Sequence, residues 1–168
     1  MEKSMEMVEM ANINNTEIER KFLVKNVPFE LDDYEVHNIY QGYIATNPTM
    51  RLRKDNDRYI FTFKGKGLIK KTEFEYELDE EQFARLWKKV ESNKIVKKRY
   101  IIPIENGLKA ELDIYEDFLE GFMTVEVEFS SMEEALVFQP PEWFGKDVSN
   151  DRRYSNASLA INGKVGKN

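Results

Sequence analysis

The feature that most constrains this sequence is an alternation of apolar and charged residues that recurs in about eight short segments, the pattern of half-buried β-strands. In the first segment, residues 17–24, the side chains of Glu17, Glu19 and Lys21 share one face of the strand, and mostly apolar side chains occupy the other. The pattern returns in residues 39–45, 50–53, 58–64, 71–78, 95–102, 108–115 and 122–129. It predicts a mainly β fold of the α+β type, an antiparallel closed β-barrel of about eight strands with a few flanking helices.

The charges on these strands are grouped by sign. Pairs of like charge recur with one residue between their members. They include Glu17 and Glu19, Glu73 and Glu75, Glu111 and Asp113, Glu126 and Glu128, Arg51 and Arg53, and Lys97 and Arg99. In an ordinary small barrel the apolar face fills the interior and the charged face meets water. A solvated surface would mix the two signs. The grouping therefore favours an inside-out barrel, with a charged lumen and an apolar exterior that helices partly cover.

Helix signals lie between and after the strands. Asp79 and Gln82 form a capping-box pattern ahead of a helix with an apolar stripe that includes Trp87, and we interpret this stripe as packing. Ser131 with Glu134 marks a second short helix. Further short helices are expected in residues 31–36 and 155–161.

The length and composition indicate a single domain. With 168 residues, of which 41% are hydrophobic, the chain can bury one sizeable core. We expect a disordered leader in residues 1–16, the barrel domain in residues 17–162 and a flexible tail in residues 163–168. The leader lacks the basic start and apolar run of a secretory signal, and no apolar run approaches the roughly 20 residues of a membrane span. These features predict a cytoplasmic protein that does not enter membranes.

The composition also excludes several kinds of site. The chain has no cysteine, which rules out disulfides, thiolate zinc sites and cysteine nucleophiles. His37 is the only histidine and no Gly-x-Ser-x-Gly motif accompanies it, which argues against a Ser-His-Asp triad. The net charge of −6 argues against general nucleic-acid binding. A metal ion would be held mainly by oxygen, which favours magnesium, manganese or calcium over zinc.

A lumen that carries both kinds of charged pair has a specific chemical use. Carboxylates two residues apart on a strand lie about 6.6 Å apart at the backbone, and at an effective dielectric of about 20 they repel by roughly 2.5 kcal/mol. A divalent cation turns this repulsion into attraction, while arginine and lysine bind phosphate oxygens. The two sets together describe a site for a metal-bound polyphosphate. Protonated carboxylates or internal salt bridges are the alternative means of neutralising such a lumen.

The first strand carries a resemblance to a known family. Glu17-Ile18-Glu19-Arg20-Lys21 resembles the Glu-x-Glu-x-Lys strand of the CYTH superfamily, also called the triphosphate tunnel metalloenzymes. The resemblance covers roughly residues 17–160 and continues, in order, through Gln41-Gly42-Tyr43, Arg51-x-Arg53, Lys64-Gly65, Glu73-x-Glu75, Lys97-x-Arg99, Glu111-x-Asp113, Glu120-Gly121, Glu126-x-Glu128 and Arg153-Tyr154-x-Asn156. Each motif is short, and the ordered set is what makes the resemblance specific.

The resemblance implies roles for the charged residues. The main metal ligands and catalytic carboxylates would be Glu17, Glu19, Glu126 and Glu128, with Glu73, Glu75 and Asp113 completing or supporting the acidic patch. Phosphate oxygens would be held by Lys21, which is also a catalytic candidate, and by Arg51, Arg53, Lys64, Lys71, Lys97, Arg99 and Arg153. Lys71 departs from the family, which often has arginine there, and lysine lacks the bidentate fork.

The resemblance also implies an activity. Members of the superfamily bind a triphosphate end to end and hydrolyse inorganic triphosphate, thiamine triphosphate or RNA 5′-triphosphate ends, or cyclise ATP. We expect hydrolysis of inorganic triphosphate to pyrophosphate and phosphate with a pair of Mg²⁺ or Mn²⁺ ions, because no domain that would recognise RNA is evident. The alternatives are an adenylate cyclase, another organic triphosphatase, or a non-catalytic polyphosphate-binding module. An exposed apolar strip on the barrel would support a homodimer.

Overall fold

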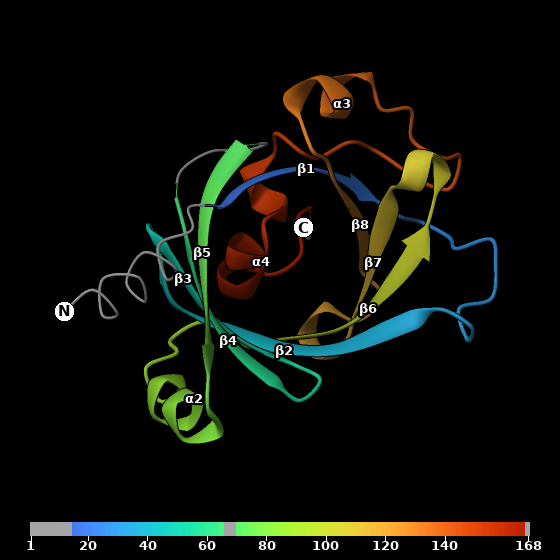
Figure 1. Ribbon diagram of the computed structural model, residues 1–168. Coiled ribbons are helices and arrows are strands. Elements are labelled where there is room, and N and C mark those ends of the chain that lie inside the picture. The colour runs from blue at the N-terminus through green and yellow to red at the C-terminus, as the bar shows by residue number, and fades with distance from the viewer. Residues whose placement is uncertain (1–14, 66–69, 167–168) are drawn as a thin grey trace.

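The computed structural model describes residues 15–65 and 70–166. Within them, antiparallel strands form a closed barrel in the order β1-β5-β4-β3-β2-β6-β7-β8 (Figure 1). The strands are β1 (Asn15–Leu23), β2 (Glu35–Thr46), β3 (Thr49–Asp55), β4 (Arg58–Lys64), β5 (Lys70–Leu78), β6 (Ile95–Pro103), β7 (Lys109–Tyr115) and β8 (Met123–Glu128). The predicted fold class is confirmed.

Helices connect and follow the strands. They are α2 (Glu80–Trp87), α3 (Met132–Val137) and α4 (Asn156–Asn162), with the 3-10 helices η1 (Glu105–Gly107), η2 (Asp117–Leu119) and η3 (Arg152–Tyr154). The predicted capping box starts α2, because the Gln82 amide donates to Asp79 Oδ1 at 2.8 Å and the Asp79 amide donates to Gln82 Oε1 at 3.0 Å. The Ser131 hydroxyl caps α3 by accepting from the Glu134 amide at 3.1 Å.

One helix prediction is wrong. In place of the helix expected over residues 31–36, residues 32–34 form a turn that leads into β2, which begins at Glu35 and is four residues longer at this end than the predicted strand. The start of β2 is polar and largely exposed, with Glu35 and His37 two residues apart, so the apolar alternation that marks its later half is missing. The backbone pairing to β6 continues nevertheless, with Glu35 opposite Ile101.

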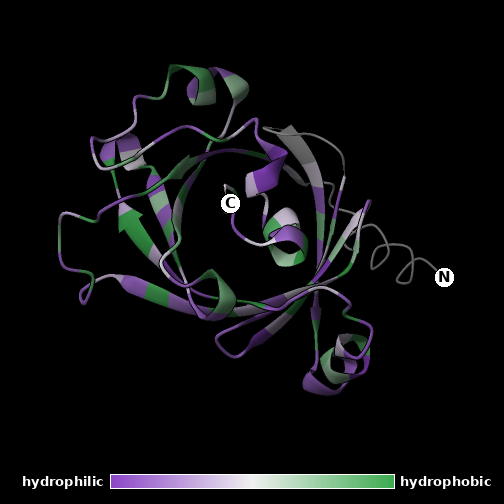
Figure 2. Ribbon diagram, turned by 180° about the vertical axis from the view of Figure 1, so that it is seen from behind, coloured by the Kyte–Doolittle hydropathy of each residue, from purple (hydrophilic) through white to green (hydrophobic). Residues whose placement is uncertain are grey.

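The barrel is inside out. Hydrophilic and hydrophobic residues alternate along its strands (Figure 2), and much of the apolar face packs outward against the covering segments. Phe22 of β1 is 1% exposed and its ring lies 5.1 Å from that of Phe144 in the segment after α3. On another side of the barrel, α2 places the ring of Trp87 4.8 Å from that of Tyr40 on β2. The main core therefore lies outside the barrel wall, and the lumen is left for charged side chains.

Helix α4 occupies one end of the barrel, which we call the α4 end. Leu159 and Ala160 of α4 are fully buried in a cluster with Tyr43, Ile95 and Tyr115, and α4 lies within the outline of the barrel in Figure 1. No helix among the described residues is long and apolar enough to cross a membrane. Of the predicted leader, residues 1–14 lie outside the described residues, and the domain limits stay predictions.

Candidate active site

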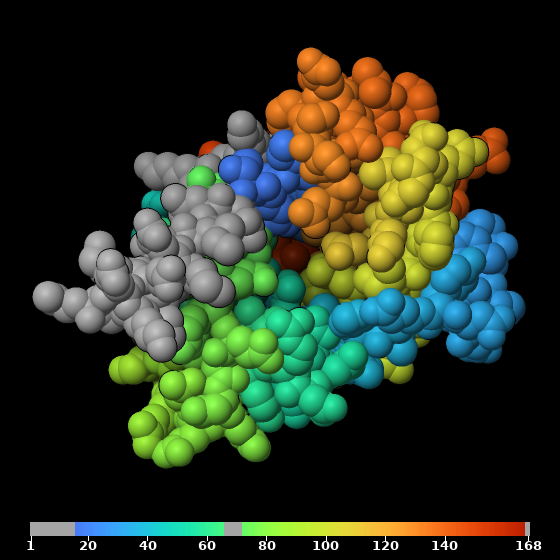
Figure 3. Space-filling view, viewed as in Figure 1, coloured from blue at the N-terminus to red at the C-terminus, as the bar shows by residue number. Residues whose placement is uncertain are grey.

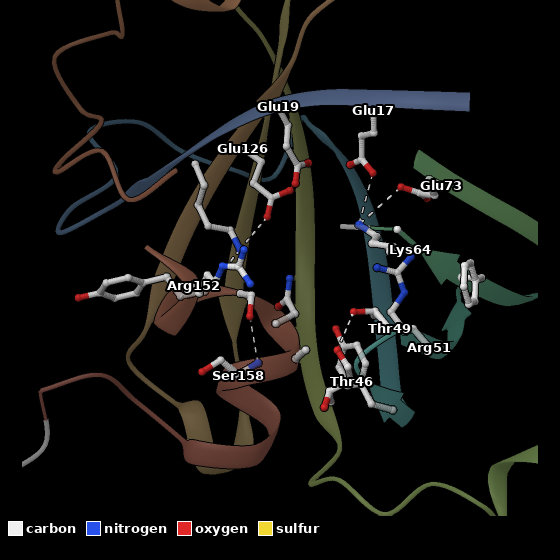
Figure 4. Close-up of a pocket in the computed structure, with 18 of the residues that line it drawn as sticks. Glu17, Glu19, Thr46, Thr49, Arg51, Lys64, Glu73, Glu126, Arg152 and Ser158 are labelled. Carbon is white, nitrogen blue, oxygen red and sulfur yellow. Dashed lines mark hydrogen bonds and ion pairs between the residues drawn. The ribbon is translucent and has the colours of Figure 1, made fainter. Parts of the chain in front are cut away.

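The lumen holds a cavity of about 1510 Å³. Inward side chains of the barrel strands line it, together with residues 148–158 and part of α4. In the space-filling view a hollow opens at the centre of the barrel, with atoms of the C-terminal part of the chain at its floor (Figure 3). Figure 4 shows charged side chains of β1, β3, β4, β5 and β8 converging on this space.

One wall of the cavity is acidic and is centred on Glu126. The Lys21 ammonium lies 3.0 Å from Glu126 Oε1 and also donates to the Tyr154 carbonyl at 2.9 Å. The carboxyl groups of Glu126 and Glu19 lie next to each other (Figure 4). Burial raises the pKa of Glu126, but Lys21 and the neighbouring cations outweigh it and hold this pKa well below its usual range. Two adjacent carboxyl groups can share either a proton or a cation, so this arrangement suits a metal ion.

Further carboxylates lie on the same wall without enough positive charge to balance them. Burial, followed by repulsion from Glu17 and Glu111, raises the pKa of Glu128. Burial raises the pKa of Glu111 too, with Glu126 adding to the rise against the effect of Arg99. Such crowding favours binding of a cation with oxygen ligands. Among the described residues, no group of three or more acidic or histidine side chains is placed so that it could hold a metal ion.

Lys64 lies between acidic residues of two neighbouring strands. Its ammonium is 3.3 Å from Glu17 Oε2 of β1 and 3.5 Å from Glu73 Oε2 of β5 (Figure 4). These three side chains were all predicted to face the lumen, and the structure brings them together there. The predicted alternative of internal salt bridges therefore accounts for part of the charge in the lumen.

The opposite side of the cavity carries arginines with few counter-charges. Arg51 is 4% exposed, donates to Thr62 Oγ1 at 3.0 Å and lies 3.7 Å from Glu75, while its Nε has no hydrogen-bond partner among the described residues. Arg53 donates to Gln41 Oε1 at 2.9 Å, and burial followed by repulsion from Arg51 and Arg99 lowers its pKa to about 10. A buried arginine whose pKa is lowered by neighbouring cations marks a place where an anion would bind.

Two of the predicted site residues lie behind the cavity wall. Lys97 and Asp113 are 1% and 0% exposed, do not line the cavity, and form an ion pair at 2.7 Å. Arg99 does line the cavity and binds the same Asp113 carboxylate through two hydrogen bonds of 2.8 and 2.9 Å. Burial, with repulsion from Arg99 and Arg53, lowers the pKa of Lys97 to about 7. Asp113 thus holds Arg99 from behind the cavity wall and pairs with Lys97 as well.

The remaining predicted phosphate ligands differ in placement. Lys71 pairs with Glu17 in the β-ladder, and its side chain lies outside the described part of the structure. Arg153 is at the rim of the cavity, where its side chain is 65% exposed and forms an ion pair with Asp151 at 2.6 Å. The other predicted site residues line the cavity.

Sequence reasoning gave no role to several residues of the cavity wall. Gln41 and Thr62 are fully buried and hold the arginine side chains of β3, and Arg152 lines the cavity beside Arg153. A signal was available for the first two, because Gln41 and Thr62 occupy inward positions of their strands. Their uncharged side chains made them look like ordinary strand residues.

Comparisons with known proteins agree with this architecture. Residues 15–155 match the CYTH domain family. An inorganic triphosphatase of Nitrosomonas europaea is 41% identical over 152 residues, which cover 87% of this chain and 97% of that protein. An inorganic triphosphatase of Acetivibrio thermocellus is 32% identical over 151 residues, covering 87% and 94%.

A crystal structure of an inorganic triphosphatase is similar in fold as well as in sequence. It has a TM-score of 0.65 and 38% sequence identity, and the match covers 86% of this chain and 94% of that one. The family match extends over most of the chain and includes every strand of the barrel. This protein is therefore a member of the CYTH domain family.

Proposed function

We propose that this protein hydrolyses inorganic triphosphate to pyrophosphate and phosphate inside the barrel. The observation that carries the proposal is the opposition of two groups of like charge, one cationic and one acidic, across one cavity. Arg51 and Arg53 face the lumen with mutually unfavourable charge, and Glu126 and Glu128 lie on an acidic wall of the same cavity. A triphosphate with bound cations complements both. The two inorganic triphosphatases that resemble the chain support the choice of substrate.

The acidic wall would hold the metal ions. Its ligands would be the carboxylates of Glu17, Glu19, Glu126 and Glu128, and oxygen ligands of this kind suit Mg²⁺ or Mn²⁺. Such an ion, when bound, lowers the pKa of water and neutralises phosphate charge. Glu73 and Glu75 lie further along the cavity wall and would support this patch. The presence of a pair of ions stays a prediction.

The cationic side would bind the substrate in line for attack. Arg51, Arg53, Lys64 and Arg99 would hold phosphate oxygens, and these contacts strengthen as charge develops on the departing pyrophosphate. Water attacks the terminal phosphorus, the bond from that phosphorus to the bridging oxygen breaks, and pyrophosphate leaves with the bonding electrons. The proton of the attacking water passes to a carboxylate of the acidic wall. No covalent intermediate is needed.

The decisive experiment measures phosphate release from inorganic triphosphate, ATP and thiamine triphosphate, each with Mg²⁺ or Mn²⁺. Wild type should release phosphate fastest from inorganic triphosphate, and Glu126→Gln should reduce the rate at least about a hundredfold if this residue holds the metal. Faster turnover of an organic substrate, or conversion of ATP to cyclic AMP, would overturn the proposal. If triphosphate raises the melting temperature but is never cleaved, the protein is a binding module.

A homodimer and a cytoplasmic location stay predictions from the sequence. Phe63 on β4 and Tyr76 on β5 are 40% and 51% exposed, so neighbouring strands offer apolar side chains that a second copy of the chain would cover. Sedimentation equilibrium of wild type and of Tyr76→Glu tests the dimer. A concentration-independent monomer mass for wild type would contradict it.

A further inference from the structure

Two consecutive arginines at the α4 end lie in different surroundings. The guanidinium of Arg153 turns back on Asp151, with Nε 2.9 Å from Oδ1 and a terminal nitrogen 2.6 Å from Oδ2. Arg152 lines the cavity, and its guanidinium has no hydrogen-bond or ion-pair partner within residues 15–65 and 70–166. Figure 4 shows Arg152 on the same side of the cavity as Glu126.

The backbone that carries Arg152 is fixed next to the acidic wall. Arg152 starts the short helix η3, whose N-terminal turn is capped by Asp151 Oδ1, which accepts from the Arg153 amide at 3.1 Å. At the other end of η3 the Tyr154 carbonyl accepts from the Lys21 ammonium at 2.9 Å. Lys21 is in turn 3.0 Å from Glu126. The position of Arg152 relative to the cavity is therefore set by contacts that do not involve its own side chain.

The other arginines of the cavity have part of their donor capacity committed. Arg53 donates to Gln41, Arg99 binds Asp113 through two hydrogen bonds, and Arg51 donates to Thr62. The guanidinium of Arg152 donates to no described residue, so all of the N–H groups of its planar fork are available to a ligand in the cavity. This is the geometry that binds a phosphate group through two parallel hydrogen bonds.

We propose that Arg152 binds the phosphate group of a linear polyphosphate that lies nearest the α4 end. The resemblance to the family gave this role to the neighbouring Arg153, whose guanidinium is occupied by Asp151. The identity of the polyphosphate as inorganic triphosphate rests on the proposed function. The contact itself rests on the placement and free donors of Arg152.

The test compares Arg152→Gln, Arg152→Lys and Arg153→Gln with wild type, and Arg85→Gln serves as the matched control. Arg85 is an exposed arginine of α2 that pairs with Glu81 and does not line the cavity. Two measurements are made: kcat and KM for inorganic triphosphate with Mg²⁺, and the rise in melting temperature caused by triphosphate in EDTA. The second reports binding without turnover.

Arg152→Gln should raise KM about tenfold, the loss expected for a charge-assisted hydrogen bond at an open site, and should reduce the triphosphate-induced rise in melting temperature. Arg152→Lys should recover part of both effects, because it keeps the charge but loses the fork. Arg153→Gln should have the smaller effect, and Arg85→Gln should match wild type. The inference is overturned if Arg152→Gln stays within twofold of wild type in KM and binds triphosphate equally well, or if Arg153→Gln has the larger effect.

Failure of this inference is distinct from failure of the proposed function. If wild type does not cleave triphosphate, the proposed function fails, and the melting-temperature comparison in EDTA still decides whether Arg152 binds the anion. If wild type cleaves triphosphate and Arg152→Gln behaves as wild type, only the assignment of Arg152 fails. Without ligand, Arg152→Gln should have the same melting temperature as wild type. The Arg152 side chain is exposed and has no partner among the described residues, so its loss removes no stabilising contact.

Discussion

The ammonium of Lys97 lies 2.7 Å from the Asp113 carboxylate, and neither side chain has any exposed surface. Arg99 binds the same carboxylate, so one negative charge serves two cations. Burial raises the pKa of Asp113, but Arg99 and Lys97 outweigh it and lower this pKa to about 2. The buried wall of the lumen therefore depends on one carboxylate staying ionised.

Replacing Asp113 by Asn should destabilise the protein strongly. The change leaves Lys97 and Arg99 buried without their shared counter-charge, and loss of one partner of a buried ion pair costs about 3–5 kcal/mol. Urea unfolding of wild type and Asp113→Asn measures the difference. Glu81→Gln, which removes the exposed pair with Arg85, is the control and should change the midpoint little. Equal midpoints for the two variants would show that the buried ion pair contributes no more to the free energy of unfolding than the exposed pair.

Replacing Arg51 by Met should separate stability from binding. The charge of Arg51 is buried with an unpaired Nε, so removing it should not lower the free energy of unfolding in the absence of ligand. The affinity for triphosphate should fall about tenfold or more, since hydrogen bonds to charged groups contribute about 1.5–3 kcal/mol. Chemical denaturation measures the first effect, and isothermal titration with triphosphate in EDTA measures the second. A less stable variant with unchanged affinity would give Arg51 a structural role instead.

His37 should make stability depend on pH. Its imidazole contacts Asp55 Oδ1 and Glu35 Oε1, each at 2.7 Å. Burial lowers the pKa of His37, but the two carboxylates outweigh burial and raise this pKa above 6.5. A raised folded-state pKa means that the stabilisation is fully present below pH 6.5 and is lost as the pH rises through the folded value. The difference in unfolding free energy between wild type and His37→Gln should therefore shrink across that range. A difference that is constant from pH 5 to about pH 9 would refute the coupling.

Gly42 should be required for the packing of α2 on the barrel. A Cβ at this position would lie 2.5 Å from Val90 Cγ1 and 3.2 Å from the Trp87 ring. Gly42→Ala should cost about 1–3 kcal/mol, as expected for overpacking. Thermal denaturation measures this cost, and a cycle with Val90→Ala tests its cause, because the shorter side chain should relieve part of it. Additive effects of the two substitutions would place the strain elsewhere.

The sequence could predict the strands and their faces because each amphipathic segment carries its own period. Residues 58–64, for example, are a strand with the predicted limits, and Asp79 caps the helix where its side chain can reach the Gln82 amide. The first part of β2 was missed, since Glu35 and His37 are polar and lie where neither face of the strand is buried. Alternation of apolar and polar residues reveals a strand only where one face of the strand is apolar and the other is polar.

Depth within the lumen could not be predicted from the same pattern. Arg99 and Lys97 are two positions apart on one strand and share a face, yet one reaches the cavity and the other lies behind its wall. Which of them meets the ligand depends on the neighbouring strands and on Asn156 of α4, whose side chain accepts from Lys97 at 3.3 Å. Likewise, the choice between Arg152 and Arg153 depends on Asp151, through contacts that no period in the sequence encodes.

A barrel with its charges inside inverts the usual map of mutational tolerance. In most domains the positions that resist change are apolar, and scoring schemes treat exchange of one charged residue for another as mild. Here Glu126 and Arg51 are 7% and 4% exposed in the middle of strands. Water cannot solvate a charge that a substitution there leaves buried and unpaired. A saturation mutagenesis scan read out by activity should therefore show its deepest intolerance at charged lumen positions, while exposed apolar residues such as Leu136, at 70% exposure, accept nearly any substitution.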